Sequence, residues 1–322
     1  MVVARMMTLW LVLLVAAASP ALAQVYPSKP VRVINPYAPG GPVDQIARPV
    51  LQHLSAAFDQ QFIMDNRGGA NGNIGAQEAA RAAPDGYTLL AGTTSLLTIN
   101  PALYKMPFDS IRDFAPIVLV SQIPGAIIVS ASHPASTLKD LLDYARANPG
   151  KLTYSSAGNG SQNHLAAELL ALLTKTSFLH VPYKGGGPAL AAVLSGEVNM
   201  IIQSPSLSTA QVRAGKLKVL GVSAARRMSI LPDAPTNDEL GLPEFRTRAG
   251  TGFLAPAKTP RAIINRLNEE TVKALRSPEL REKFNTLVMD PMPMSPADFD
   301  TFIKKEIQLN AELVKAAGIE PS

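Results

Sequence analysis

The 322-residue chain contains no cysteine and carries a formal net charge of +5 at pH 7. The absence of cysteine excludes disulfides, thiol nucleophiles, iron–sulfur sites and a lipid-modified N-terminal cysteine. The basic residues are scattered, and after residue 23 the only doublets are Arg226-Arg227 and Lys304-Lys305. The charge therefore favours a general attraction of anions over a nucleic-acid-binding surface.

Residues 1–23 have the pattern of a secretory signal peptide. Arg5 supplies the positive flank, Leu9 to Ala18 is apolar, and Ala21-Leu22-Ala23 is a small-x-small cleavage site. The apolar stretch is shorter than the roughly 20 residues of a membrane-spanning helix, although an uncleaved anchor is the alternative. We expect cleavage before Gln24 and export to a bacterial periplasm, where a chain without cysteine needs no disulfides.

The first unit after this peptide is a strand, a glycine turn and a helix. Val31–Ile34 is rich in β-branched residues, Tyr37-Ala-Pro-Gly-Gly-Pro42 interrupts it, and apolar residues from Val43 to Leu54 recur at the spacing of one helical face. Unpaired N–H groups at such a helix start attract anions. Asp44, in the first turn, is expected to hold the turn in shape rather than to contact an anion.

The same pattern of a short strand, a polar loop and a helix recurs along the chain. The predicted loops are Asn66–Gly75 after a strand at Phe62–Met64, Gly92–Ser95 after Tyr87–Ala91, Ser155–Asn163 after Leu152–Tyr154, Pro182–Pro188 after Phe178–Val181, and Gln203–Ser206 after Val198–Ile202. Thr137–Asp140 and Ser295–Asp298 fit capping boxes, and Pro260 opens a further predicted helix.

The mature chain is longer than a single hydrophobic core usually supports, so we expect two lobes. The predicted crossings are at Ser121–Gly125 and Arg246–Pro256. They place the first part of lobe 1 at residues 24–122, lobe 2 at 123–246, and the second part of lobe 1 with the C-terminal helices at 247–322. Alternating strands and helices predict an α/β fold with mostly parallel sheets flanked by helices, in which ligands bind at the carboxyl ends of strands.

Enzyme motifs are absent from the sequence. No loop has the G-x-G-x-x-G spacing or a Walker lysine. Ser155, Ser156 and Ser161 are candidate nucleophiles with His164 or His180 as the base, but they lack the G-x-S-x-G context of a serine hydrolase. An exported esterase using Ser156 or Ser161 with His164 remains the alternative function.

Metal binding is disfavoured because the four histidines have no H-x-x-x-H or H-E-x-x-H arrangement. His164 stands beside a polar loop, where a role near ligand and a structural role are both open. Arg67 and Lys184 each adjoin a glycine loop. Two roles are open for each of them: it pairs with a carboxylate, or it is a solvated surface charge. Polar loops at five or more junctions in two lobes, without a catalytic constellation, predict a cleft in which amide and hydroxyl donors hold a small anion.

Several motifs occur in the order and spacing of a known family. They are Tyr26–Asp44, Asn66–Gly75, Ala83–Leu89, Asn100–Tyr104 and Val181–Pro188. Together with the secretory peptide, they resemble the Bug-type periplasmic solute receptors of tripartite tricarboxylate transporters, over essentially the whole mature chain.

The resemblance implies a type II periplasmic binding-protein fold, with two α/β lobes joined by two crossing strands and C-terminal helices that return to lobe 1. It implies that a carboxylate is held mainly by backbone amides, hydroxyls and bridging water, with no catalytic residue, cofactor or metal. The ligand-binding residues it implies are Tyr37, Ala38, Pro39, Gly40, Gly41, Gly69, Ala70, Asn71, Gly92, Thr93, Thr94, Ser156, Ala157, Gly158, Asn159, Ser161, Tyr183, Gly185, Gly186 and Gln203.

The expected partners are a small mono- or dicarboxylate and the membrane permease subunits of a tripartite tricarboxylate transporter. A monomer that closes like a Venus flytrap and binds no nucleic acid is implied, with presentation of the solute to a membrane signalling protein as an alternative. Three positions depart from the family pattern. Asn71 and Asn73 add side-chain amides to the second loop, and Gln203 stands where many relatives carry Asp, which predicts a carboxylate without an amino group.

Overall fold

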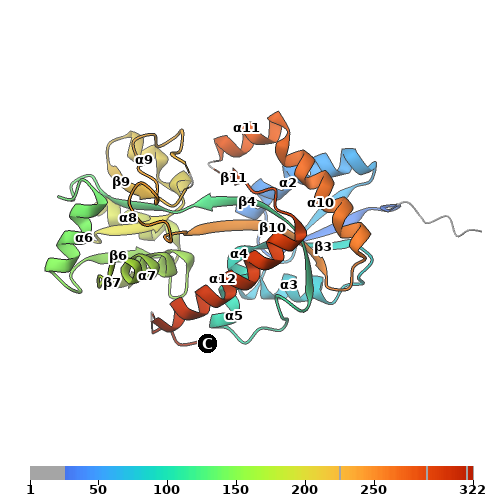
Figure 1. Ribbon diagram of the computed structural model, residues 1–322, viewed down its shortest axis with the longest axis horizontal. Helices are drawn as coiled ribbons and strands as arrows, with labels where there is room; N and C mark the ends of the chain where they lie inside the picture. The colour runs from blue at the N-terminus through green and yellow to red at the C-terminus, as the bar shows by residue number, and fades with distance from the viewer. Residues whose placement is uncertain (1–25, 225, 288, 317, 322) are drawn as a thin grey trace, which may run out of the picture.

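The computed structural model describes residues 26–321 except 225, 288 and 317. These residues form two sheets that lie side by side, each flanked by helices (Figure 1). We call the sheet that contains the N-terminal strand, with its helices, the first lobe, and the other sheet with its helices the second lobe. The predicted signal peptide at residues 1–23 lies outside the described residues.

The first lobe has a six-stranded sheet of order β11-β4-β10-β3-β1-β2. Its strands are β1 (Val31–Asn35), β2 (Phe62–Asn66), β3 (Thr88–Thr93), β4 (Phe114–Pro124), β10 (Arg248–Pro256) and β11 (Asp290–Pro291). Its helices are α2 (Pro42–Phe58), the 3₁₀ turn η1 (Ala70–Gly72), α3 (Asn73–Ala80), α4 (Thr94–Thr98), α5 (Asn100–Leu103), α10 (Arg261–Arg276), α11 (Pro278–Thr286) and α12 (Pro296–Ala316).

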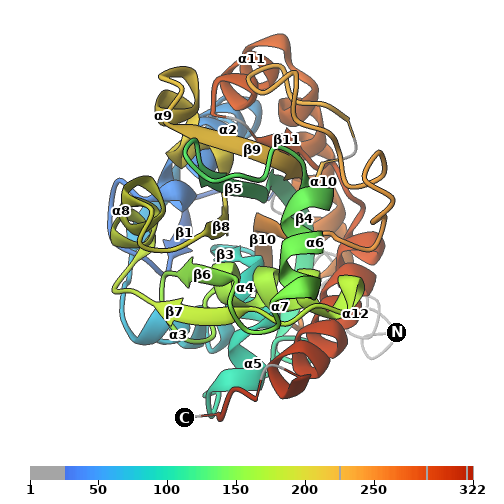
Figure 2. The ribbon, with the colours of Figure 1, turned by 90° about the vertical axis from the view of Figure 1, so that its left-hand side faces the viewer.

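The second lobe has a five-stranded sheet of order β7-β6-β8-β5-β9. Its strands are β5 (Ala126–Ser130), β6 (Thr153–Ser156), β7 (Leu179–Pro182), β8 (Met200–Gln203) and β9 (Leu217–Val222). Its helices are α6 (Leu138–Ala147), α7 (Gln162–Thr174), α8 (Gly186–Ser195), η2 (Pro205–Leu207) and α9 (Thr209–Arg213). Figure 2 shows α8 on one side of this sheet and α6 and α7 on the other.

The two-lobed α/β fold was predicted correctly, but the sheets are mixed rather than mostly parallel. β1 pairs in parallel with β2 and β3, and β6 pairs in parallel with β7 and β8. β10 is antiparallel to β3 and β4, β11 to β4, and β5 to β8 and β9. The antiparallel pairs arise because the strands that connect the lobes enter each sheet beside strand–helix–strand units that run the other way.

The chain passes between the lobes along two adjacent strands. β4 leads through Gly125 into β5, and β10 follows Thr247 back to the first lobe, so that β4 and β10 run side by side between the lobes (Figure 1). The Gly125 amide donates to the Thr247 carbonyl at 2.8 Å, and the Ser223 amide donates to the Gly125 carbonyl at 2.8 Å. These bonds hold the two crossings together at one point.

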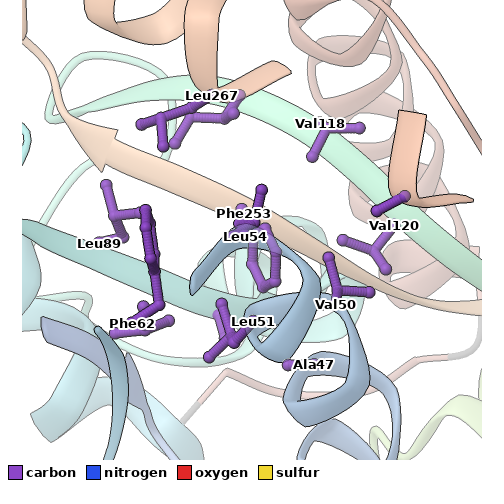
Figure 3. Packing of buried hydrophobic residues seen from close by; sticks show 14 of the residues in the cluster. Ala47, Val50, Leu51, Leu54, Phe62, Leu89, Val118, Val120, Phe253 and Leu267 are labelled. Carbon is purple, nitrogen blue, oxygen red and sulfur yellow. The ribbon is translucent and has the colours of Figure 1, made fainter. Parts of the chain in front are cut away.

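The first lobe is organised around the apolar face of α2. Ala47, Val50, Leu51 and Leu54 are buried at helical spacing and pack against side chains of the sheet and α10 (Figure 3). Each large apolar side chain buried there contributes about 1.5–3 kcal/mol to folding. This packing fixes the start of α2, and with it the loop that follows β1, relative to the sheet.

α12 packs on both lobes. Phe299 and Ile303, in its first half, belong to the apolar core of the first lobe. Leu313 and Val314, near its end, are buried together with Leu165 and other residues of the second lobe. No helix in the described part of the chain is long and apolar enough to cross a membrane.

Candidate functional site

A cavity of about 290 Å³ lies between the lobes and is lined by both of them. The first lobe contributes Tyr37, Asn71, Ser95, Leu96, Ile99, Asn100, Leu103 and Tyr104, and the second contributes Ala157, Asn159, Gly160, Ser161 and Gln162. We call this cavity the cleft. Among the described residues, no Asp, Glu, Lys or Arg side chain lines it, so its polar character comes from hydroxyls, amides and the backbone.

The first-lobe wall of the cleft is built from loops that bind one another. The Tyr37 hydroxyl lies 2.7 Å from Thr93 Oγ1, where α4 begins after β3. Burial raises the pKa of Tyr37, so its hydroxyl stays protonated. Asn100 Nδ2 donates to the Asn71 carbonyl at 3.2 Å, and Asn71 Nδ2 donates to the Tyr104 hydroxyl at 2.8 Å.

The loop after β2 takes an unusual backbone path to reach this wall. Ala70 and Asn71 both have left-handed backbone angles, with φ of 45° and 53°. Such angles are costly for residues other than glycine and persist where the surroundings enforce them. The bonds of Asn71 to Asn100 and Tyr104 supply that enforcement, and they turn the Asn71 side chain toward the cleft.

Asp44 has the structural role that the sequence predicts. Its carboxylate is buried, accepts a hydrogen bond from the Gly40 amide, and lies 3.0 Å from the Arg48 guanidinium. Gly40 has a φ of 81°, which favours glycine, whereas Gly41 has an extended backbone. The turn therefore depends on Asp44 and on glycine at position 40, where φ is positive. The extended backbone at Gly41 does not require glycine.

The second-lobe wall of the cleft is the loop between β6 and α7. Two histidines that do not line the cleft bind this loop. Ser156 Oγ lies 2.6 Å from His180 Nε2, and the Gly160 amide donates to His164 Nδ1 at 3.1 Å. The two imidazole rings stack with centroids 3.8 Å apart. Ser161 caps α7 by accepting from the His164 amide, so the loop is fixed at both ends.

Burial lowers the pKa of both histidines. The pKa of His164 falls to about 4, mainly through desolvation and then through the proximity of His180, and desolvation lowers the pKa of His180. Both rings are therefore neutral near pH 7. Because the Gly160 amide donates to Nδ1 of His164, that ring carries its proton on Nε2.

This arrangement does not form the predicted esterase pair. His180, not His164, contacts Ser156, and Ser156 is fully buried and lines no cavity of the cleft. Ser161 Oγ is used as a helix cap. A nucleophilic serine must reach substrate next to a base, and neither Ser156, which is buried, nor Ser161, which caps α7, is placed in this way.

A second cavity, of about 280 Å³, adjoins the cleft, and Ala157 and Gln162 line both. Of the sequence-predicted ligand residues, Tyr37, Asn71, Ala157, Asn159 and Ser161 line the cleft, and Ala157, Gly186 and Gln203 line the second cavity. Thr94 borders a smaller cavity of about 40 Å³ beside α12. The Thr94 hydroxyl accepts a hydrogen bond from the Gly250 amide.

The other predicted ligand residues line neither large cavity: Ala38, Pro39, Gly40, Gly41, Gly69, Ala70, Gly92, Thr93, Ser156, Gly158, Tyr183 and Gly185. Several of them shape the site from outside it. Thr93 binds Tyr37, and Ser156 binds His180. The Tyr183 hydroxyl donates to Glu197.

The sequence analysis did not select Ser95, Asn100, Tyr104, Gln162, Asn163 and Thr247 as site residues. Asn100 and Tyr104 lie in a motif that carried the family resemblance, and Ser95, Gln162 and Asn163 lie in predicted polar loops, so a signal existed for these five. Thr247 lies in the predicted crossing at Arg246–Pro256, where no motif marks a ligand-binding residue. Arg67, for which two roles were open, pairs with Asp65 at 3.1 Å, and Lys184 is exposed.

Within residues 26–321, leaving out the three undescribed positions, no group of three or more His, Asp or Glu side chains is arranged to hold a metal ion. The site thus consists of uncharged donors and acceptors. It can bind an anion through backbone amides, side-chain amides and hydroxyls, assisted by the positive end of the 13-residue helix α7.

Two α/β lobes joined by paired crossing strands, with a polar cleft between them, define a solute-binding receptor of the periplasmic binding-protein class. Residues 46–319 match the family described as "Tripartite tricarboxylate transporter family receptor". The chain belongs to this family.

Relatives and solved structures agree with this assignment. The chain is 37% identical to a UPF0065 protein from Pseudomonas sp. strain P51, over 90% of this chain and 86% of the relative, and 33% identical to BugT of Bordetella pertussis, over 94% and 93%. Rpa4515 of R. palustris, solved with adipate, is 33% identical with a TM-score of 0.76, covering 92% of this chain and all of that one. MatC of Rhodopseudomonas palustris, solved with malate, is 31% identical with a TM-score of 0.71, covering 90% of this chain and all of that one.

Proposed function

We propose that this protein is a periplasmic receptor that binds a small organic carboxylate in the cleft and delivers it to the membrane permease of a tripartite tricarboxylate transporter. The observation that carries the proposal is the cleft itself, which both lobes line with uncharged hydrogen-bond donors beside the start of α7. Hydrogen bonds to a charged group contribute about 1.5–3 kcal/mol each. A few such donors suffice to hold a carboxylate without an arginine or lysine.

Adipate and malate bound in two relatives support a carboxylate as the ligand class. In our proposal the protein is a monomer that binds without catalysis, and the lobes, divided at residues 122/123 and 246/247, close around the ligand. Ligand contacts on both lobes favour the closed state, because only that state makes all of them at once. Delivery to a permease rests on membership of the family.

Isothermal titration calorimetry of the purified protein with adipate and malate tests the binding step. Adipamide and 1,4-diaminobutane serve as neutral and cationic controls of similar size. We expect at least one carboxylate to bind and both controls to give no heat. Binding of the diamine, or of adipamide as tightly as adipate, would show that the cleft does not select an anion.

A pair of tyrosine variants tests whether the cleft is the site. Tyr37→Phe removes the bond to Thr93 that fixes the first-lobe wall, and we expect carboxylate affinity to fall about fivefold, as the loss of one hydrogen bond implies. Tyr144→Phe, at an exposed position on α6, is the matched control. Equal affinities for the two variants would remove Tyr37 from the site.

A further inference from the structure

The cavity that adjoins the cleft is a chamber with apolar walls that ends on the second lobe. It lies where β8, the start of α7 and the crossing strands meet. Its apolar lining residues are Ile123, Pro124, Ala166, Ile202, Leu207 and Ala249. The chamber and the cleft share Ala157 and Gln162, so the two cavities are neighbours.

Two buried polar side chains line this chamber. Gln203, at the end of β8, is only 4% exposed, and neither its Nε2 nor its Oε1 has a hydrogen-bond partner among the described residues. Thr247, at the crossing point, is 7% exposed, and its Oγ1 likewise has no partner in the described part of the chain. A buried polar group without a partner costs about 1–3 kcal/mol, so folded proteins rarely keep one without a use.

Glycine residues pack beside the polar atoms of both side chains. A Cβ placed on Gly186, in the first turn of α8, would lie 3.7 Å from Gln203 Oε1, and a Cβ placed on Gly125 would lie 2.4 Å from Thr247 Oγ1. Glycine at both positions keeps side chains away from the two polar groups. The neighbouring Asn163 is already engaged, since its Nδ2 donates to the Ile202 carbonyl at 2.7 Å.

The charges around the chamber limit what can occupy it. No acidic or basic side chain among the described residues lines it, so an ammonium group would be buried without an anion, close to the positive ends of α7 and α8. A second carboxylate can accept from Gln203 Nε2 but has no proton to donate to Gln203 Oε1. A hydroxyl or a carboxamide both donates and accepts, and satisfies the two ends of the Gln203 amide.

We infer that the chamber binds the uncharged end of the ligand and that Gln203 and Thr247 determine specificity there. The inferred ligand class is a carboxylate with an apolar middle and a terminal hydroxyl or carboxamide. This inference rests on the proposed function, because it takes the carboxylate to be held in the cleft.

A series of six-carbon carboxylates that differ only at the far end tests the inference by calorimetry. The probes are 6-hydroxyhexanoate, adipamate, hexanoate, adipate and 6-aminohexanoate, with the corresponding four-carbon series to cover a shorter ligand. We expect the hydroxyl- or carboxamide-ended member of one series to bind at least about tenfold more tightly than the methyl-, carboxylate- and ammonium-ended members, as one satisfied buried hydrogen-bonding group implies.

Variants of Gln203 assign the preference to this side chain. Gln203→Met keeps the length and removes the hydrogen bonds, and should bring the hydroxyl- and carboxamide-ended probes to the affinity of the methyl-ended one without weakening the latter. Gln203→Glu supplies the missing anion and should raise the affinity for the ammonium-ended probe. Gln52→Met, at an exposed position on α2, is the matched control, and circular dichroism confirms that each variant is folded.

The outcomes separate the inference from the proposed function. Tighter binding of adipate or 6-aminohexanoate by the unaltered protein, or an unchanged preference in Gln203→Met, would overturn the inference and leave carboxylate binding intact. Failure of every member of both series, and of malate, to bind would overturn the proposed function and the inference with it.

Discussion

His164 and His180 hold the loop between β6 and α7 without lining the cleft. One ring accepts from the Gly160 amide and the other contacts Ser156, so the two imidazoles hold both ends of the turn at residues 156–160. Each ring is neutral when it makes these contacts. Protonation of His164 would remove the acceptor at Nδ1 and place a charge against His180.

The lowered pKa of His164 predicts how stability depends on pH. The unfolded chain has a histidine pKa near 6.5 and the folded chain a value of about 4, so between these values the unfolded state binds more protons. The full contribution of His164 to the free energy of unfolding is present above about pH 6.5. As the pH drops toward 4, this contribution falls by about 1–3 kcal/mol. Urea unfolding followed by circular dichroism from pH 8 to pH 4.5 measures this loss.

A pair of histidine variants assigns the loss to its residue. His164→Asn keeps an acceptor for the Gly160 amide but cannot titrate, and should flatten the pH dependence. His53→Asn, on α2, should keep the full dependence, because His53 lies far from the loop. The same slope in the His164 variant as in the unaltered protein would show that another group is responsible.

At the scale of elements, α3 sets the position of two cleft loops through Gly75. A Cβ at this position would lie 2.6 Å from the Arg67 carbonyl and 2.9 Å from Pro36 Cα, so the helix packs directly on the backbone that follows β1 and β2. Both segments lead into the first-lobe wall of the cleft. The contact is between backbone atoms, which cannot turn aside as a flexible side chain would.

Gly75→Ala should therefore push α3 away from the two loops and destabilise the protein by about 1–3 kcal/mol, as overpacking of a close contact does. Gly187→Ala is the matched control: it lies in α8, nothing lies within 4 Å of its added Cβ, and alanine favours a helix by about 0.5–1 kcal/mol. Midpoints of thermal unfolding distinguish the two. A Gly75 variant as stable as the unaltered chain would mean that α3 moves without resistance.

The elements also show what a sequence can and cannot predict here. The helical spacing of apolar residues correctly predicted the position of α2. The capping boxes at Thr137 and Ser295 correctly predicted where α6 and α12 begin. α4 and α5 are five and four residues long, too short to show a helical period, so the sequence predicts a polar loop at Gly92–Ser95, where α4 begins, and no helix at α5. Asn100 and Tyr104 were therefore marked only by the family motif in which they lie, and not by a helical pattern.

The candidate site was predictable where it depends on local chemistry and not where it depends on distant pairing. Glycine loops after strands indicated the positions of Tyr37, Asn71 and the loop before α7. Thr247 joins the chamber because β10, which begins directly after it, pairs with β4 from a distant part of the sequence. The lack of partners for Gln203 is likewise a property of the assembled lobes.

At the scale of the whole molecule, ligand binding should bring the lobes together. We expect small-angle X-ray scattering to show a smaller radius of gyration with a saturating carboxylate that binds by calorimetry than without it, because contacts on both lobes stabilise the closed state. Addition of 1,4-diaminobutane should leave the curve unchanged. Superimposable curves with and without bound carboxylate would contradict closure.

α12 restricts the form that this closure takes. The helix is anchored in the first lobe by Phe299 and Ile303, and its last turns are buried in the second lobe through Leu313 and Val314. A single continuous helix cannot stretch, so the lobes cannot simply separate along the line that joins them. We therefore expect closure to be a rotation of the lobes about α12 and the paired crossings, with solute entering and leaving at the edge of the cleft farthest from them.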